Sequence, residues 1–132
     1  MNIELQNKLY KKYPKLFKQK DLPMTQTCMC WGICTGDGWY WIIDNLCNCV
    51  QSYIDNNEKD QIEITQVKEK FGSLRFYTSY SNQFINGMIC LSEHYSWNTC
   101  ENCGSINNII HTKGWISTLC KDCIEKRNKK ED

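Results

Sequence analysis

The sequence predicts an α+β fold, in which helices cover one side of a small antiparallel sheet and a zinc-ribbon module follows at the C-terminal end. Three observations predict it. Apolar and polar residues alternate through the hairpin 62–80, two further segments carry apolar residues at helical spacing, and two Cys-x-x-Cys motifs lie beyond residue 97. Helices packed on one face of a small antiparallel sheet are the simplest way to bury such amphipathic elements.

The hairpin is predicted from its alternation and from one glycine. Gly72 can take the positive φ of a tight turn, so residues 70–73 are expected to form the loop. The phase of the first strand would leave Val67 on the polar face. Either a bulge near Gln66 corrects the phase or both faces are partly covered. The alternating apolar residues are Ile62 and Ile64 before the turn and Leu74 and Phe76 after it.

Three helices are predicted around this hairpin. The first covers 3–13 and must end there because Pro14 disfavours helical geometry in the residue before it. The second covers 39–54, where apolar residues recur at steps of three and four. Asp37 is well placed to cap it, since a carboxylate can accept from free N–H groups at a helix start. The third covers about 82–97.

Size and charge limit the organisation and the partners. The chain has 132 residues, which fits a core domain over 1–97 and a zinc-ribbon module over 98–132 packed on it. The net charge of +1 provides no global field for nucleic acid or for an anionic membrane, so any such binding must be local. Lysines are nevertheless concentrated at both ends of the chain.

Ten cysteines in a short chain suggest either disulfides or metal binding. The N-terminal residues have no apolar run of the secretory type, and no stretch is long enough to span a bilayer. We therefore expect a cytoplasmic protein with reduced thiols.

The most specific signal is a pair of Cys-x-x-Cys motifs separated by sixteen residues. Each motif directs two sulfurs at one point, and four thiolates complete the closed tetrahedron of a structural Zn²⁺ site. The predicted ligands are Cys100, Cys103, Cys120 and Cys123.

The other six cysteines and the two histidines are interpreted as structural. A second site, with Cys28-x-Cys30 facing Cys47-x-Cys49, would lack the usual knuckle spacing, and buried free thiols are the simpler interpretation. Cys34 and Cys90 belong to the same group. His94 and His111 are ordinary surface or packing residues in this interpretation.

Catalysis is not expected. A Cys–His nucleophile pair would need a cysteine beside a histidine, and only two histidines are present. Metal-finger nucleases also carry paired cysteine motifs, but here the interval between the pairs has His111 without an adjacent acidic residue. We expect a non-enzymatic protein with no catalytic residues.

A binding function is the remaining class. Guanidinium groups and helix N-termini hold phosphate, and aromatic rings stack on bases, so a small anionic nucleotide-type ligand is expected near the turn. Structural roles compete with this hypothesis, because Trp39 fits a core position, Asp37 a cap and the lysines a solvated turn. The candidate ligand-binding residues are Arg75, Tyr77, Lys68, Lys70, Trp39 and Asp37.

Several motifs together resemble a family of small uncharacterised phage and prophage proteins, over nearly the whole chain. The matching segments are Gly36-Asp37-Gly38-Trp39, Gln66 to Gly72, Leu74 to Tyr77, Cys100-Glu101-x-Cys103-Gly104 and Gly114-Trp115. One departure is Thr35, which separates Cys34 from Gly36 where the family has cysteine next to the glycine.

The resemblance implies a phage protein in the host cell cytoplasm, but it implies no activity. A nucleotide binder there would act as a sponge for a host antiviral defence signal, an anti-defence role. The alternative is a zinc-ribbon adaptor that binds nucleic acid or a host protein through the basic termini. No membrane partner is expected, and a homo-oligomer is compatible with the sequence.

Overall fold

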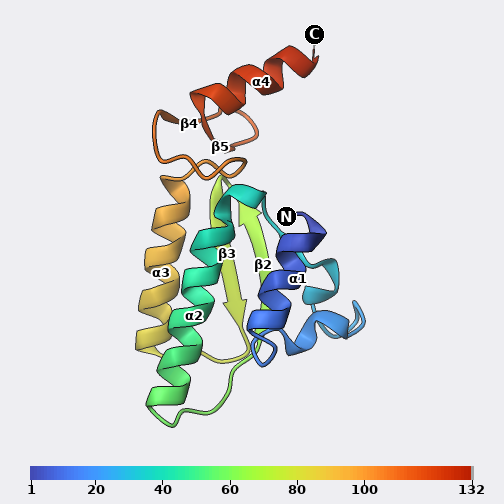
Figure 1. Cartoon of the computed structure of the whole chain (residues 1–132), viewed down its shortest axis with the longest axis vertical. Helices are drawn as coiled ribbons and strands as arrows, with labels where there is room; N and C mark the ends of the chain where they lie inside the picture. Colours follow the sequence, from blue (N-terminus) through green and yellow to red (C-terminus); the bar gives the residue numbers. More distant parts are fainter. Residues whose placement is uncertain (132) are drawn as a thin grey trace.

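The structure, a computed structural model, describes residues 1–131, which form an α+β fold with a C-terminal ribbon at one end (Figure 1). No helix within these residues is long and apolar enough to cross a membrane. The helices are α1 (Ile3–Lys12), α2 (Tyr40–Asn56), α3 (Gln83–Trp97) and α4 (Lys121–Glu131), with 3-10 turns η1 (Lys18–Asp21), η2 (Met29–Trp31) and η3 (Asp37–Trp39). The strands are β1 (Ile33–Cys34), β2 (Ile64–Lys70), β3 (Ser73–Thr78), β4 (Ile109–His111) and β5 (Thr118–Cys120).

The predicted hairpin is confirmed, and a third strand extends it. β2 pairs with β3 antiparallel, and the two-residue β1 pairs with β2 in parallel, which makes the sheet mixed. The register shifts between Ile64 and Gln66, so of the two alternatives the bulge is the one present. As a result Ile64 and Val67 both face the core and are fully buried.

The turn of the hairpin consists of Phe71 and Gly72, both at positive φ, +53° and +80°. Two consecutive residues of this kind define the turn that matches the right-handed twist of paired strands. The predicted loop 70–73 is therefore correct. Glu69 supports the turn because its carboxylate accepts from the backbone N–H of Gly72 at 2.7 Å.

The three predicted helices are present, and α2 and α3 pack side by side on the sheet (Figure 1). α3 runs along the free edge of β3, where the backbone N–H of Leu74 donates to Ser96 Oγ at 2.8 Å. One continuous core joins Leu9 of α1 and Leu46 of α2 to Phe76 of β3 and Ile85 of α3. The helices and the inner face of the sheet thus form a single hydrophobic unit.

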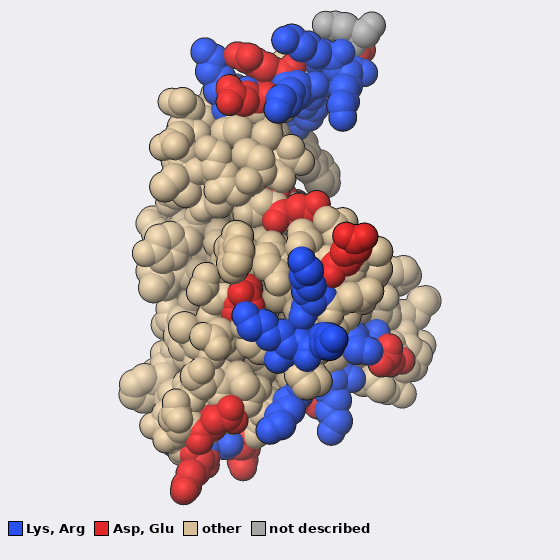
Figure 2. All heavy atoms as spheres, viewed as in Figure 1, with Lys and Arg blue, Asp and Glu red and all other residues tan. Residues whose placement is uncertain are grey.

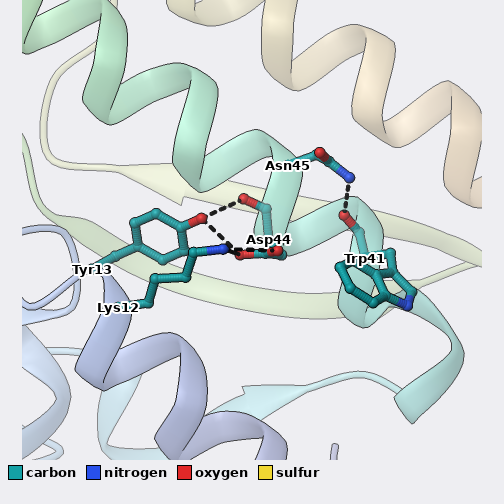
Figure 3. A network of polar contacts seen from close by, with 5 residues as sticks. All are labelled: Lys12, Tyr13, Trp41, Asp44 and Asn45. Atoms are coloured by element: carbon teal, nitrogen blue, oxygen red, sulfur yellow. Dashed lines mark hydrogen bonds and ion pairs between the residues drawn. The ribbon is translucent and has the colours of Figure 1, made fainter.

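A buried polar network joins α1 to α2 (Figure 3). The Tyr13 hydroxyl donates to Asp44 Oδ1 at 2.6 Å, and Lys12 Nζ lies 2.9 Å from the same oxygen. Burial of the phenol, together with its hydrogen bond to Asp44, raises the pKa of Tyr13 to about 12. Asn45, the next residue of α2, donates from Nδ2 to the carbonyl of Trp41, one turn earlier, at 2.7 Å.

The prediction that Asp37 caps α2 is wrong. No side chain caps η3 or α2, and the Asp37 carboxylate instead accepts from the backbone N–H of Asn2 at 2.7 Å and from Asn2 Nδ2 at 2.9 Å. Asn2 in turn caps α1, accepting from the N–H of Leu5 at 2.9 Å. Asp37 therefore connects the start of α1 to the loop before α2.

Candidate metal centre and basic cavity

Four cysteines at the C-terminal end form a compact cluster. The sulfurs of Cys100, Cys103, Cys120 and Cys123 all lie within 4.8 Å of one another, and Cys103 Sγ is 3.6 Å from Cys120 Sγ. All four are free thiols. Sulfurs at this mutual distance suit a single tetrahedral ion that binds all four. The C-terminal segment therefore fits a zinc-ribbon module, and the cluster can hold a metal ion.

Local backbone geometry brings the first cysteine pair to this position. The N–H of Gly104 donates to the carbonyl of Cys100 at 2.9 Å, and the N–H of Cys100 donates to the carbonyl of Ser105 at 2.7 Å. Gly104 has φ +79°, a region that side chains disfavour, so the glycine after the pair completes the tight turn. The second pair starts at the end of β5, which pairs antiparallel with β4, and Cys123 lies in the first turn of α4.

The surroundings of the cluster act differently on its thiols. At Cys103 the backbone N–H of Ser105 lowers the pKa, but burial and the neighbouring cysteine sulfurs outweigh it and raise the pKa to about 12, and the pKa of Cys123 is raised as well.

Cys100 is the cysteine whose surroundings favour the thiolate. Burial alone would raise the pKa of Cys100, but backbone N–H groups of Cys120, Cys103 and Asn102 donate to its sulfur, and the pKa falls to about 7. Asn102 Nδ2 also donates to Cys123 Sγ at 3.3 Å. Such outer hydrogen bonds orient metal ligands and stabilise their charge.

The Gly36–Gly38 loop holds this cysteine turn against the core. The N–H of Gly38 donates to the carbonyl of Glu101 at 2.7 Å, and the N–H of Gly36 donates to Glu101 Oε1 at 2.9 Å. A Cβ on Gly38 would overlap the carbonyl oxygen of Cys100 and lie 2.5 Å from the Gly104 nitrogen. Burial raises the pKa of the Glu101 carboxyl. Two motifs far apart in sequence thus form one contact.

A second contact joins the ribbon to the hairpin and to α3. The Thr118 hydroxyl donates to the carbonyl of Gly72 at 2.5 Å. His111 stacks on Trp97 with ring centroids 3.6 Å apart, and His111 Nε2 lies 2.8 Å from the Trp97 carbonyl oxygen. His111 therefore has a packing role, as the sequence indicated.

The remaining cysteines do not form a second cluster in the part of the chain that the structure describes. Cys47 is fully buried, and burial raises the pKa of its thiol strongly, which suits a free core thiol. The prediction of buried free thiols is wrong for four others, which are exposed: Cys28, Cys34, Cys49 and Cys90. Cys28 lies in a loop, Cys34 in the two-residue strand β1, and Cys49 and Cys90 on outer faces of α2 and α3.

Two of the predicted ligand-binding residues have structural contacts. Trp39 is fully buried, and its Nε1 donates to the carbonyl of Thr99 at 2.9 Å. Its ring is therefore part of the core, which was the competing interpretation. The carboxylate of Asp37 is exposed but bonded to Asn2.

The other four predicted residues share the outer face of the sheet. Lys68 is opposite Arg75 in the register, and Gln66 is opposite Tyr77, with the core residues on the alternate positions. The Arg75 guanidinium donates to Ser73 Oγ at 2.6 Å and lies 3.7 Å from Glu93 Oε2. Tyr77 and Lys70 are exposed. The structure brings these four together and leaves Trp39 on the opposite side.

A concavity that the sequence did not indicate lies beside the metal cluster. Its volume is about 600 Å³, and Glu101, Asn102 and Cys123 form the side nearest the metal cluster. We call it the basic cavity, because four cations of α4 also line it: Lys126, Arg127, Lys129 and Lys130. Figure 2 shows this end of the molecule dense with Lys and Arg.

The sequence signal for the basic cavity was the run of lysines near the C-terminal end, which is also typical of a solvated helix face. Only the position of α4 against the ribbon distinguishes the two interpretations.

Comparisons of the chain with protein families, with characterised proteins and with solved structures found no match.

Proposed function

We propose that this protein is a non-enzymatic zinc-ribbon adaptor that binds nucleic acid through the basic cavity. The observation that carries the proposal is the convergence of four cations on one concavity next to the cysteine cluster. Phosphate groups are bound by Lys and Arg at such surfaces, while the chain as a whole has a net charge of only +1. The binding energy is therefore local to α4.

The metal in this proposal is Zn²⁺, and its role is structural. Four thiolates are the donor set that zinc prefers in closed tetrahedral sites, and they leave no coordination position for a substrate. The ion would fix both cysteine turns and with them the start of α4.

Native mass spectrometry tests the metal. We expect one zinc ion per chain in the wild type and none in Cys120→Ser, while Cys28→Ser, which removes an exposed thiol outside the cluster, keeps the ion. A wild type that is purified with another metal, or zinc retained by Cys120→Ser, contradicts this assignment.

Fluorescence anisotropy with a labelled single strand and a labelled duplex tests the binding. The variant with Lys126, Arg127, Lys129 and Lys130 all changed to Gln should lose at least about tenfold in affinity. With roughly four phosphate contacts, the logarithm of the affinity for duplex should fall with the logarithm of salt concentration at a slope of about −3 to −4.

A matched control removes the same charge elsewhere. Lys8, Lys11, Lys15 and Lys18 are exposed lysines near the other end of the chain, and changing all four to Gln should leave the affinity within about threefold. Equal losses in both variants would mean that binding is a general charge effect, and no binding of the wild type at low salt would exclude the adaptor function.

A second candidate is a sponge for a small anionic nucleotide, which the shared outer face of β2 and β3 favours. Lys68 and Arg75 are directly opposite each other, and like charges in that position repel. Glu93, 3.7 Å from the Arg75 guanidinium, balances one of the two charges, so one positive charge on this face stays available to an anion. Lys70 and Tyr77 extend the same face. Together with the resemblance to phage proteins, this supports an anti-defence role in the host cytoplasm.

A thermal-shift panel of cyclic and linear nucleotides tests this candidate. A ligand at 100 times its dissociation constant stabilises a protein by about 2.7 kcal/mol, so a true ligand should raise the Tm by several degrees. The shift should be lost in Lys68→Gln with Lys70→Gln and kept in the α4 variant. No shift with any nucleotide argues against the sponge, and hydrolysis of a panel member argues against both candidates.

A further inference from the structure

The strongest unexplained feature of the molecule is the outer side of α3. Its exposed apolar residues recur at steps of four, three and four, which is the spacing of a coiled-coil seam. Exposed fractions are 69% for Phe84, 56% for Leu91 and 57% for Tyr95, with Met88 half-buried between them. We call this row the α3 seam: Phe84, Met88, Leu91 and Tyr95.

α3 already uses another stripe to pack on its own chain. Ile85 and Ser96 are buried against the sheet and α2, and Ile89 packs on the same core. A helix that is apolar on more than one side is normally buried on more than one side. Within residues 1–131 the α3 seam is covered only in part. Met88 packs against the core and the Phe84 ring stacks on Tyr53 with ring centroids 5.4 Å apart, while Leu91 and Tyr95 stay exposed.

A groove between α2 and α3 adjoins the seam. It has a volume of about 370 Å³ and is lined by residues that include Trp41 of α2 and Leu91 and Tyr95 of α3. Trp41 is 70% exposed, and its indole borders the groove. None of the lining residues is charged. In Figure 2 the surface on the α3 side is likewise almost free of charged residues.

Gly87 provides an independent observation. A glycine inside a helix costs about 1 kcal/mol against alanine, and here a Cβ would meet no described atom within 4 Å. The chain itself therefore gives no packing reason for this residue. A small residue next to an apolar seam lets another helix approach closely.

We propose that the α3 seam is the interface of a symmetric homodimer, in which α3 of two copies pairs antiparallel. In that register the two-fold axis passes between Met88 and Leu91. Each Phe84 then meets Tyr95 of the second copy and enters the groove beside it, while each Met88 meets Leu91. The row is self-complementary because positions 84 and 95 are equally far from the axis on its two sides, and so are positions 88 and 91.

The chemistry of the face selects a second copy. An isologous contact places the same surface on both sides, so a seam without charged residues brings no like charges together at the two-fold axis. A charged partner would find no complementary charges on the groove residues. Aromatic side chains bury about 150–250 Å² each, so Trp41, Phe84 and Tyr95 present roughly 400 Å², about half of the 800 Å² per partner of a standard interface.

Analytical ultracentrifugation tests the dimer. At about 100 µM, where a micromolar contact is populated, the wild type should sediment at twice its chain mass of 15.6 kDa. Leu91→Glu brings two carboxylates close to the axis and should give the monomer mass. The matched control is Ile3→Glu, which changes an exposed aliphatic residue of α1 and should keep the dimer.

Charge reversal tests the register. Phe84→Lys alone and Tyr95→Glu alone should each weaken the dimer at least about tenfold, because each buries an unpaired charge. The double variant should recover part of that loss, because opposite charges meet across the axis only in the antiparallel register. Within one chain the two positions are about 16 Å apart along α3 and cannot pair.

The outcomes are distinguishable. A wild type that remains at 15.6 kDa overturns the proposal and leaves the seam to another protein or to solvent. A dimer that persists in Leu91→Glu places the interface elsewhere, and a double variant no better than its single variants overturns the antiparallel register. Circular dichroism of each variant shows that the fold is retained, because these side chains are exposed.

Discussion

Gly38 lies where the backbone of the core touches the first cysteine turn. A Cβ there would overlap the carbonyl oxygen of Cys100, and both partners are backbone atoms that cannot rotate away. The glycine is thus required by close approach, since Gly38 has an ordinary negative φ. Gly36 is restricted in the same way, because a Cβ there would overlap the carbonyl oxygen of Glu101.

We expect Gly38→Ala to lower the free energy of unfolding by about 2–3 kcal/mol, the cost of overpacking a tight contact. Urea denaturation followed by tryptophan fluorescence measures it. The control is Gly87→Ala in α3, where open space and helical geometry should raise the stability by up to about 1 kcal/mol. A Gly38→Ala protein as stable as the wild type would mean that the ribbon is not held by this loop.

The phenol of Tyr13 is the buried donor to Asp44, so Tyr13→Phe should cost about 2 kcal/mol at neutral pH, the contribution of a hydrogen bond to a charged group. Tyr80→Phe, an exposed tyrosine, should cost nothing measurable.

This cost should also depend on pH. Below pH 10 the phenol is neutral in both the folded and the unfolded chain, and the contribution is complete. As the pH rises toward 12 the unfolded phenol ionises while the folded one, with a pKa of about 12, does not, so the advantage of the wild type over Tyr13→Phe shrinks. A difference that is constant from pH 9 to 12 would contradict the shifted pKa.

In the β2–β3 hairpin, the residue at the first turn position does not suit the backbone conformation that the turn requires. Phe71 has φ +53° at the first turn position, where asparagine is favoured, and its ring is two-thirds exposed. Its ring lies 5.6 Å from Lys70 Nζ, which compensates only in part.

Phe71→Asn should therefore raise the free energy of unfolding by about 0.5–1 kcal/mol. The left-handed conformation costs most side chains about 1–2 kcal/mol, and asparagine adopts it more readily than phenylalanine does. Phe71→Val, with a branched Cβ, should lower it. Chemical denaturation with an unchanged m-value measures both, and a destabilised Phe71→Asn would show that the ring contributes more to folding than the turn geometry costs.

Periodicity predicted the elements well because it reports which face of each one is buried. The three predicted helices, the hairpin, its bulge and the turn at Gly72 all follow from spacings of two or of three to four residues. β1 could not be predicted, since two residues carry no period. The cap at Asp37 was wrong because Asn2, thirty-five positions earlier, competes for the carboxylate.

The candidate site also has one part that the sequence could predict and one part that it could not. The cysteine cluster was predictable because the ligand spacing is local to each motif. The basic cavity was not, because it depends on how α4 leaves the ribbon after Cys123. Trp39 and Arg75 cannot line one pocket, since the ring is buried in the core and the guanidinium is on the outer face.

For the whole molecule, we expect removal of the metal to unfold the ribbon while the core stays folded. A chelator should unfold the ribbon, because a structural zinc ion supplies folding free energy directly. Hydrogen exchange should then show fast amides beyond residue 98 and continued protection in α2, whose hydrophobic core contains none of the four cysteines of the metal cluster. Unchanged exchange after complete removal of metal would contradict a structural ion.

The interlock of the Gly36–Gly38 loop with the cysteine turn limits how this chain can be rearranged by recombination. The loop belongs to the first third of the sequence and the turn to the last quarter, yet the two are joined by hydrogen bonds. The indole N–H of Trp39 likewise donates to the carbonyl of Thr99, just before the cysteine turn. Neither the core domain nor the ribbon can therefore be replaced without changing the other. A chimaera that takes the ribbon from another protein should fold only if it inherits a loop shaped to receive it.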